Sequence, residues 1–210
     1  MNPRPRKILL LRWLPGRLML TRAPATGQSL YLTFDDGPNP GHTPAVLDLL
    51  ARYKAKATFF VLGSQAERNP GLMQRIADEG HAFGNHSWDH PSFLRIPPAE
   101  QCEQIERTDR VIGAYNGGRP ISFRPPSGRF PPTLLLRFLR QRRRMAYWSY
   151  DSLDYRREPL ERMLATIRAQ PPVAGDVVLM HDDSDLTTQA LAALLPEWCA
   201  AGFALRALPD

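Results

Sequence analysis

Two adjacent carboxylates, Asp35 and Asp36, end a short apolar stretch and stand directly before Gly37 and Pro38. Strand ends are where α/β enzymes hold their reactive groups, although acidic residues before Gly-Pro also serve simply to shape a turn. Adjacent strand residues point to opposite sides, so the two carboxylates cannot ligate one ion in the same way. We expect one of them to bind a metal ion and the other to remove a proton from water.

His86 and His90 form a second pair suited to metal binding. Their spacing of four residues places two imidazoles on one face of a helical turn, where both can hold one ion. An isolated pair at this spacing is often incidental. A carboxylate from Asp35 or Asp36 would complete a three-ligand site of the zinc type, with an open position for the reactive water.

Further polar residues follow other apolar stretches. His181 ends the run 177–180 and is a candidate general acid for the leaving group, the alternative being a structural histidine. Arg124 precedes two prolines, which would hold its guanidinium in place to orient a carboxylate and keep it ionised; a structural salt bridge is the alternative. Asp151 and Asp154 are candidates to orient His181 or to pair with Arg124.

The pattern of apolar stretches indicates the elements that position these residues. Thr43 with Pro44 and Asn69 with Pro70 are typical of helix starts, and Gly80 is typical of a helix end. Short strands that alternate with helices predict a parallel α/β fold. The expected strands are residues 30–34, 57–62, 81–85, 121–124, 146–150, 176–181 and 203–207.

The placement of the polar residues selects among parallel folds. They follow several different strands, and the strand ends of a closed or nearly closed barrel share one face. An open sheet would scatter them along an edge, so the distribution favours a barrel. Trp148 and Tyr155 lie near the same strand ends and are candidates for an aromatic wall that packs on sugar rings, or for ordinary core.

Composition sets further bounds. The 210 residues, 43% hydrophobic, fit one domain, which we place at residues 28–210 after a basic N-terminal extension, residues 1–27. Cys102 and Cys199 have no metal-binding spacing, so we expect two buried free thiols rather than a zinc-thiolate site or a disulfide framework.

The net charge of +6 comes mainly from arginine. The cluster at 137–144 follows apolar residues at helical spacing and resembles the solvated end of a helix more than a nucleic-acid site, so we expect no nucleic-acid partner. An anionic lipid or saccharide is a better match for a basic face.

The apolar core of residues 1–27 is too short and interrupted for a signal peptide or membrane span, which favours a location in the cytoplasm or at the inner face of the membrane. Peripheral contact through Leu9, Trp13, Leu14 and Leu18, or packing of the same side chains on the domain, are the alternatives for this segment.

Together these residues resemble the polysaccharide deacetylase family, the carbohydrate esterases of family 4 with the NodB homology domain. The resemblance covers residues 28–208, and its motifs occur in the family's order. They are Thr33-Phe-Asp-Asp-Gly37, His86-Ser-Trp-Asp-His90, Arg124-Pro-Pro-Ser-Gly128, Asp151-Ser-Leu-Asp-Tyr155 and Leu179-Met-His181.

The resemblance implies a distorted (β/α)7–8 barrel of the NodB-like, glycoside hydrolase–deacetylase type. It also implies a divalent ion, zinc with Co2+, Mn2+ or Ni2+ as alternatives, held by Asp36, His86 and His90. By the same resemblance Asp35 is the general base and His181 the general acid. Arg124 would then tune Asp35, and Asp154 would tune His181.

The resemblance also implies how substrate is held. Tyr155 and Leu179 would flank the pocket for the acetyl methyl group, and a backbone N–H near Ser127 would help the metal hold the oxyanion. Tyr155 stands where the family usually has tryptophan, and Ser127 where many members have tyrosine. These departures concern the shape of the sugar groove and not the reacting groups.

The implied activity is hydrolytic removal of N-acetyl groups from a poly- or oligosaccharide that contains N-acetylglucosamine, with release of acetate. O-deacetylation, or hydrolysis of another amide at the same site, is the nearest alternative. A noncatalytic carbohydrate-binding relative is an alternative of another class, but such a protein would be expected to lose base or metal ligands. A regulatory nucleic-acid binder is the remaining alternative, testable by salt-dependent binding of DNA or RNA.

Overall fold

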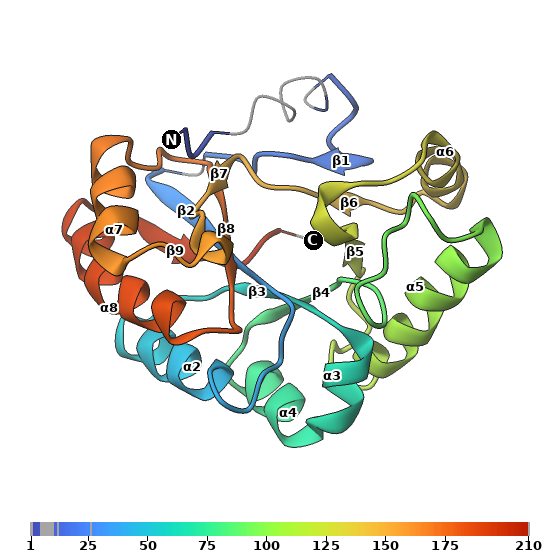
Figure 1. The fold of residues 1–210 in the computed structure, drawn as a ribbon, viewed down its shortest axis with the longest axis horizontal. Coiled ribbons are helices and arrows are strands. Elements are labelled where there is room, and N and C mark those ends of the chain that lie inside the picture. Colours follow the sequence, from blue (N-terminus) through green and yellow to red (C-terminus); the bar gives the residue numbers. More distant parts are fainter. Residues whose placement is uncertain (1, 5–10, 12, 26, 210) are drawn as a thin grey trace.

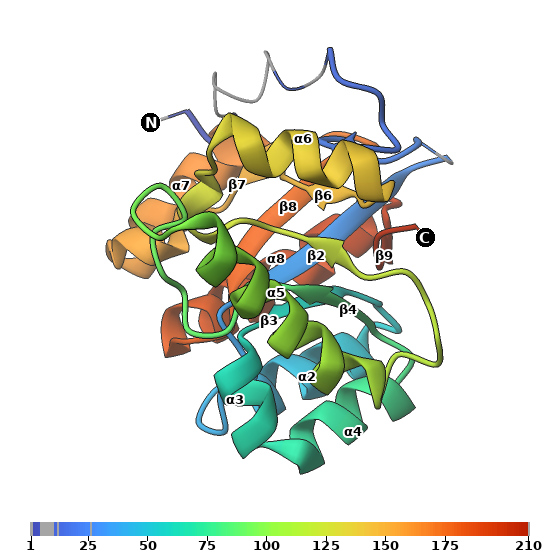
Figure 2. The same ribbon diagram turned by 90° about the vertical axis from the view of Figure 1, so that its right-hand side faces the viewer.

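A computed structural model of the chain describes residues 2–4, 11, 13–25 and 27–209. Its strands form one curled sheet with helices packed around the outside (Figures 1 and 2). The strands are β1 Met19–Leu20, β2 Ser29–Asp35, β3 Thr58–Val61, β4 Ala82–Asn85, β5 Ser122–Phe123, β6 Met145–Ala146, β7 Tyr150–Asp151, β8 Val177–His181 and β9 Ala204–Arg206. The α-helices are α2 Thr43–Arg52, α3 Gly63–Arg68, α4 Pro70–Asp78, α5 Pro98–Gly113, α6 Pro132–Gln141, α7 Leu160–Ala169 and α8 Asp185–Ala200, and the short 3-10 helices are η1 Pro126–Gly128 and η2 Asp154–Arg156.

The sheet confirms the predicted parallel α/β barrel. Its strand order is β1-β6-β5-β4-β3-β2-β8-β7, with β9 added to β2, and the pairings are parallel. The segment between β6 and β7 spans the two ends of this sheet. The Tyr147 N–H donates to the Leu20 carbonyl at 2.7 Å, and the Ser149 N–H donates to the Val177 carbonyl at 3.0 Å. The sheet is therefore a curled half-barrel whose two end strands, β1 and β7, do not pair with each other but are linked through this segment.

The same segment corrects one predicted strand. Residues 146–150 do not form a single strand, because β6 pairs with β5 while β7 pairs with β8 at the other end of the sheet. The aromatic run has the composition of a strand, but composition carries no information about a change of partner.

The predicted helix boundaries are partly right. Asn69 precedes α4 and Gly80, with φ 73°, follows its end, as expected. Thr43 is wrong as a cap, because it is the first residue of α2, after His42. Its hydroxyl donates to the Asp182 carboxylate instead, which draws the helix start toward the end of β8.

The alternation of side chains along β2 explains how one strand serves both the core and the site. Leu30, Leu32 and Phe34 belong to the core cluster that contains residues from α2 and α8. Thr33 and Asp35 have the opposite parity and point into the barrel, where both contact the fully buried Arg124.

The N-terminal segment contributes to the sheet through β1. Leu18 is buried and Leu14 packs against the same core cluster, whereas Trp13 is 89% exposed and Leu9 lies outside the described residues. The packing alternative therefore applies to Leu14 and Leu18, and the domain boundary at residue 27 stays a prediction. Among the described helices, none is long and apolar enough to cross a membrane. The predicted location stays a prediction as well.

Both cysteines are free thiols, as predicted. The expectation that they are buried is wrong, since Cys102 and Cys199 are each half-buried. Both lie on helices, α5 and α8, whose outer sides face solvent.

Candidate metal centre and active site

A cleft of about 950 Å³ lies at the carboxyl ends of the central strands. The residues that line it come from the ends of β2, β4, β5, β7 and β8 and from the loops that follow them. They are Asp35, Asp36, His86, His90, Pro91, Ser92, Leu94, Arg95, Pro126, Ser127, Gly128, Arg129, Trp148, Asp151, Tyr155, Arg157, Leu179, His181 and Asp183. Of the predicted site residues, Arg124 and Asp154 lie behind this surface, because both are buried.

The Asp35–Asp36 pair departs from the expected strand geometry. Asp35 ends β2 and points into the barrel, but Asp36 is already beyond the strand and has a φ of 75°. This left-handed backbone turns its carboxylate back, so both residues line the same cleft. Simple alternation is therefore wrong here, although the two carboxylates still have different partners.

His86 and His90 lie on a loop and not on the expected helical turn. The backbone after β4 takes positive φ values at Ser87 and His90, 76° and 63°. Gln104 of α5 holds this loop, accepting the Trp88 N–H at 2.8 Å. The ring centroids of the two histidines lie 5.1 Å apart, so the loop achieves the convergence that the spacing predicted from a helix.

The tautomer of His86 suits a metal ligand. Its Nδ1 is 2.7 Å from the Arg124 carbonyl oxygen, and because a carbonyl only accepts, Nδ1 carries the proton and Nε2 keeps its lone pair. Burial lowers the pKa of His86 to about 3, which keeps the ring neutral. Its Nε2 is 3.6 Å from Oδ1 of Asp36.

Asp36, His86 and His90 together fit a divalent cation. One ligand atom from each lies within 4.8 Å of the other two. Oδ1 of Asp36 is buried and has no hydrogen-bond partner among the described residues, and it faces the Nε2 atoms of both histidines. A buried carboxylate oxygen left in this way is costly unless a cation takes the place of the missing donor.

Asp35 has a different environment, dominated by a buried cation. Arg124 donates to Oδ1 of Asp35 at 2.6 Å and to the Thr33 hydroxyl at 2.9 Å. Its other nitrogens donate to the carbonyls of Ala146 and Tyr147 at 3.2 and 3.1 Å. Burial raises the pKa of Asp35 and the adjacent guanidinium opposes that rise. Burial likewise lowers the pKa of Arg124, against the charge of Asp35.

His181 is held by a buried anion. Asp154 accepts from Nδ1 of His181 at 2.8 Å and from its backbone N–H at 2.7 Å, and also accepts the Thr187 hydroxyl at 2.9 Å. Burial alone would lower the pKa of His181, but the hydrogen bond and charge of Asp154, with Asp35 and Asp36, raise it to about 10. Burial opposes the reciprocal effect on Asp154, whose pKa is nevertheless lowered by His181.

Asp151 makes neither a hydrogen bond nor an ion pair with His181 or Arg124, the two partners considered for it. Its Oδ1 accepts the Leu153 N–H at 2.9 Å, and it is Asp154 that binds His181. Burial, with a smaller contribution from the charge of Asp154, raises the pKa of Asp151 to about 6.

The predicted substrate-contacting residues all line the cleft. Ser127 has a φ of 53°, and among the described residues its backbone N–H has no acceptor. Leu179 is almost fully buried, Tyr155 is 55% exposed and forms a T-shaped ring pair with His181, and Trp148 stacks on Tyr147. Tyr155 and Trp148 both line the cleft, but each ring packs against a different residue.

Sequence reasoning missed residues that hold the reacting groups. Thr33 stood in a motif but was given no role, and its hydroxyl accepts a hydrogen bond from Arg124. Thr187 was not singled out, and its hydroxyl donates to Asp154. Asp182 follows His181 directly, and that adjacency was the available signal. It is fully buried, accepts the Thr43 hydroxyl and packs against Gly37 so closely that no Cβ fits there.

Fold and site define the chain as a parallel α/β barrel with a candidate metal-binding triad at the carboxyl ends of its strands. The family model for polysaccharide deacetylases matches residues 22–143. The peptidoglycan-N-acetylglucosamine deacetylase PgdA of Listeria monocytogenes is 35% identical over 194 residues, 91% of this chain and 41% of that protein. The chitooligosaccharide deacetylase of Bradyrhizobium is 34% identical over 200 residues, 87% of this chain and 90% of that protein.

Solved structures agree with these sequence matches. The Bc1960 peptidoglycan N-acetylglucosamine deacetylase superposes with a TM-score of 0.83 at 30% identity, covering 93% of this chain and 95% of that one. The chain belongs to the polysaccharide deacetylase family. It spans less than half the length of the Listeria relative.

Proposed function

We propose that this chain is a metal-dependent hydrolase that removes N-acetyl groups from a glycan containing N-acetylglucosamine and releases acetate. The observation that carries the proposal is the pairing of two proton-transfer groups with opposite charges on either side of the cation-binding triad: Asp35 with Arg124 and His181 with Asp154. The names of the related deacetylases support the substrate class.

Asp36, His86 and His90 would hold the ion, and we propose zinc. A divalent ion bound there supplies Lewis acidity, which polarises an acyl oxygen and lowers the pKa of water to about 7. The neutral His86 ring and the unpartnered Oδ1 of Asp36 are the ligand states that such an ion needs. Cobalt, manganese and nickel accept the same donor set.

Asp35 is the proposed general base. Its carboxylate faces the cleft next to the triad, with Nε2 of His86 3.6 Å from its Oδ2, while Arg124 occupies the other oxygen. That leaves Oδ2 to accept the proton of the attacking water. The guanidinium favours the ionised carboxylate, which burial alone would disfavour.

His181 is the proposed general acid. With a pKa near 10 it carries a proton at neutral pH, and because Asp154 occupies Nδ1, Nε2 is the atom that can deliver a proton to the leaving amine. The backbone N–H of Ser127 is available to the developing oxyanion, and one such donor is worth about 10² to 10³ in rate. Leu179 and Tyr155 would bound the acetyl methyl group and Trp148 a neighbouring sugar.

Acetate release tests the proposal. Metal-loaded protein is incubated with N-acetylglucosamine oligomers and peptidoglycan fragments, beside metal-stripped protein and the Asp35→Asn and His90→Ala variants. Asp78→Asn is the matched control, because Asp78 is a surface carboxylate on α4 whose Oδ1 accepts a hydrogen bond from Gln74. We expect loss of about 10²-fold or more in the Asp35 variant and no change in the control. Acetate from O-acetylated glycans but not from N-acetylated ones would replace amide with ester hydrolysis.

A further inference from the structure

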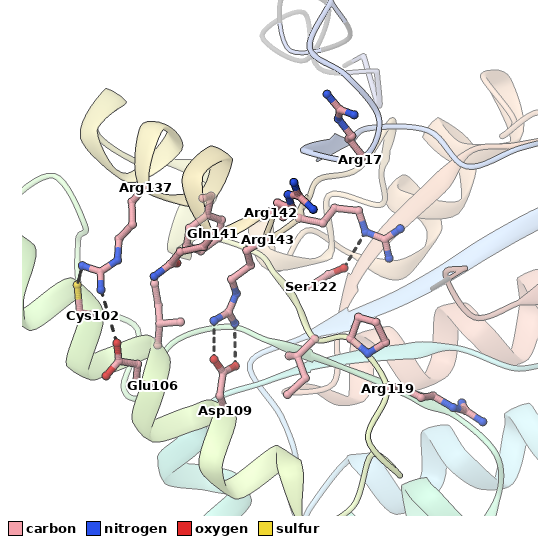
Figure 3. A pocket seen from close by; sticks show the side chains of 15 residues that line it. Arg17, Cys102, Glu106, Asp109, Arg119, Ser122, Arg137, Gln141, Arg142 and Arg143 are labelled. Carbon is pink, nitrogen blue, oxygen red and sulfur yellow. Dashed lines mark hydrogen bonds and ion pairs between the residues drawn. The ribbon is translucent and has the colours of Figure 1, made fainter.

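A second hollow, of about 650 Å³, lies between α5 and α6 (Figure 3). It opens at the amino ends of the strands, since Ser122 begins β5 and Arg144 directly precedes β6. None of its lining residues lines the catalytic cleft, which is at the carboxyl ends. The hollow is therefore separate from the cleft and lies toward the opposite ends of the strands.

Arginine dominates this hollow, which we call the arginine groove. Six arginines and two carboxylates line it. The arginines are Arg17, Arg119, Arg137, Arg142, Arg143 and Arg144, and the acids are Glu106 and Asp109. Guanidinium groups gathered in a concave surface repel one another unless an anion lies among them.

The two carboxylates are already neutralised. Arg143 donates to both oxygens of Asp109, at 2.5 and 2.7 Å, and Arg137 pairs with Glu106 at 3.6 Å. These pairs are drawn as dashed lines in Figure 3. The groove therefore has no acid left to balance its remaining arginines.

Three arginines of the groove have side chains without a partner among the described residues: Arg17, Arg119 and Arg142. They come from separate segments, before β1, before β5 and at the end of α6, and Figure 3 shows Arg119 apart from the other two. Arg142 adopts a left-handed backbone, φ 53°, which is uncommon for a residue with a side chain.

Compensation of helix dipoles accounts for only part of this arrangement. Arg142 caps the C-terminus of α6 and offsets the partial negative charge there. Arg17 and Arg119 do not end helices, since Arg17 precedes β1 and Arg119 lies beyond the end of α5 at Gly113. Their presence on the same concavity needs another reason.

We propose that the arginine groove binds a phosphate-bearing ligand, either a diphosphate or the phosphate headgroup of an anionic lipid. Planar guanidinium forks match phosphate oxygens in pairs, and three unpaired forks call for a ligand with more than one negative charge. Ile105, Ile121 and Phe138 add apolar lining between the charges, which suits a phosphate with an apolar substituent. The proposal is independent of the deacetylase activity.

Binding to the intact protein tests this site with two probes. Calorimetric titration with inorganic pyrophosphate measures a soluble phosphate, and flotation with phosphatidylcholine vesicles containing phosphatidic acid measures a headgroup. The test variant is the triple Arg17→Gln, Arg119→Gln, Arg142→Gln. The matched control is the triple Arg52→Gln, Arg68→Gln, Arg206→Gln, which removes equal charge from exposed arginines outside the groove.

We expect saturable binding of at least one probe, weakened about tenfold or more in the groove triple and less than twofold in the control. Acetate release should be equal in all three proteins. Pyrophosphate binding identifies a soluble ligand, and binding to vesicles alone identifies a lipid headgroup. The proposal is overturned if neither probe binds. It is also overturned if both triple variants weaken binding equally, or if the groove triple binds the probe as tightly as the unsubstituted protein. Groove-dependent binding of RNA without binding of either phosphate probe overturns it too.

Discussion

The hydrogen bond between Asp154 and His181 makes a prediction with a definite sign. In Asp154→Asn the amide is nearly isosteric with the carboxylate but carries no charge. Burial of His181 remains and lowers its pKa, while the largest opposing contribution, from Asp154, is gone. The pKa of His181 should therefore fall from about 10.

The size of the fall follows from the burial of the pair. Loss of one partner of a buried ion pair costs about 3–5 kcal/mol, and one pKa unit is about 1.4 kcal/mol, so we expect a fall of about 2–4 units. The pair also stabilises the fold. Because the pKa of His181 is raised in the folded protein, the stability that the pair contributes is fully present below about pH 6.5 and is lost as the pH rises through about 10.

Two assays measure this shift. NMR of ring-labelled histidine follows the His181 titration directly. The alkaline limb of the kcat/KM profile follows it in turnover, because in the proposed mechanism only protonated His181 donates to the leaving amine. Thr187→Val is the control, since it removes one hydrogen bond to Asp154 without changing charge, and it should shift the midpoint by less than about one unit. An NMR midpoint that stays near 10 in Asp154→Asn would refute the electrostatic reasoning.

Three further predictions concern the supporting residues. Arg124→Met leaves the buried Asp35 carboxylate without its cation, so the free energy of unfolding in urea should fall by about 3–5 kcal/mol at neutral pH. Part of this loss should be recovered at acid pH, where Asp35 is neutral. An unchanged free energy of unfolding would mean that Asp35 is already protonated at neutral pH. His86→Ala removes one ligand of the triad. Elemental analysis should then find well below one zinc ion per chain, while the circular dichroism spectrum stays unchanged. Full zinc occupancy in this variant would mean that the ion binds elsewhere. Gly37→Ala puts a Cβ against the Asp182 carboxylate and should cost about 1–3 kcal/mol in urea unfolding, whereas Gly71→Ala, a substitution into open space on α4, should not destabilise.

The sequence predicted the residues of the candidate site better than the backbone that positions them. Residue types and their order predicted which side chains gather, because strand ends of a parallel barrel share one face. The positive φ of Asp36 and the loop at His86–His90 were not predictable, since each depends on partners from other elements, such as Gln104 on α5. The conformational propensities of the residues in a segment do not indicate which distant residues that segment will contact.

The N-terminal part of the sheet shows the same limit. Met19 and Leu20 pair with Met145 and Ala146, far away in the chain, and a two-residue strand has too little pattern to be recognised. The arginine groove was not predictable from the sequence either. The cluster at 137–144 was visible in the sequence as a basic helix end, but Arg17 and Arg119 join it only through the fold.

The two proposed proton-transfer groups illustrate why the charged partner of a side chain matters more than its residue type. Asp35 and His181 are register partners on the neighbouring strands β2 and β8, so their positions alone would let either exchange a proton with a bound substrate. Arg124 favours the ionised form of Asp35, and Asp154 favours the protonated form of His181. Opposite buried partners therefore separate the acid from the base at a single pH. Exchanging either partner for a neutral residue should remove that separation while leaving both reacting groups in place.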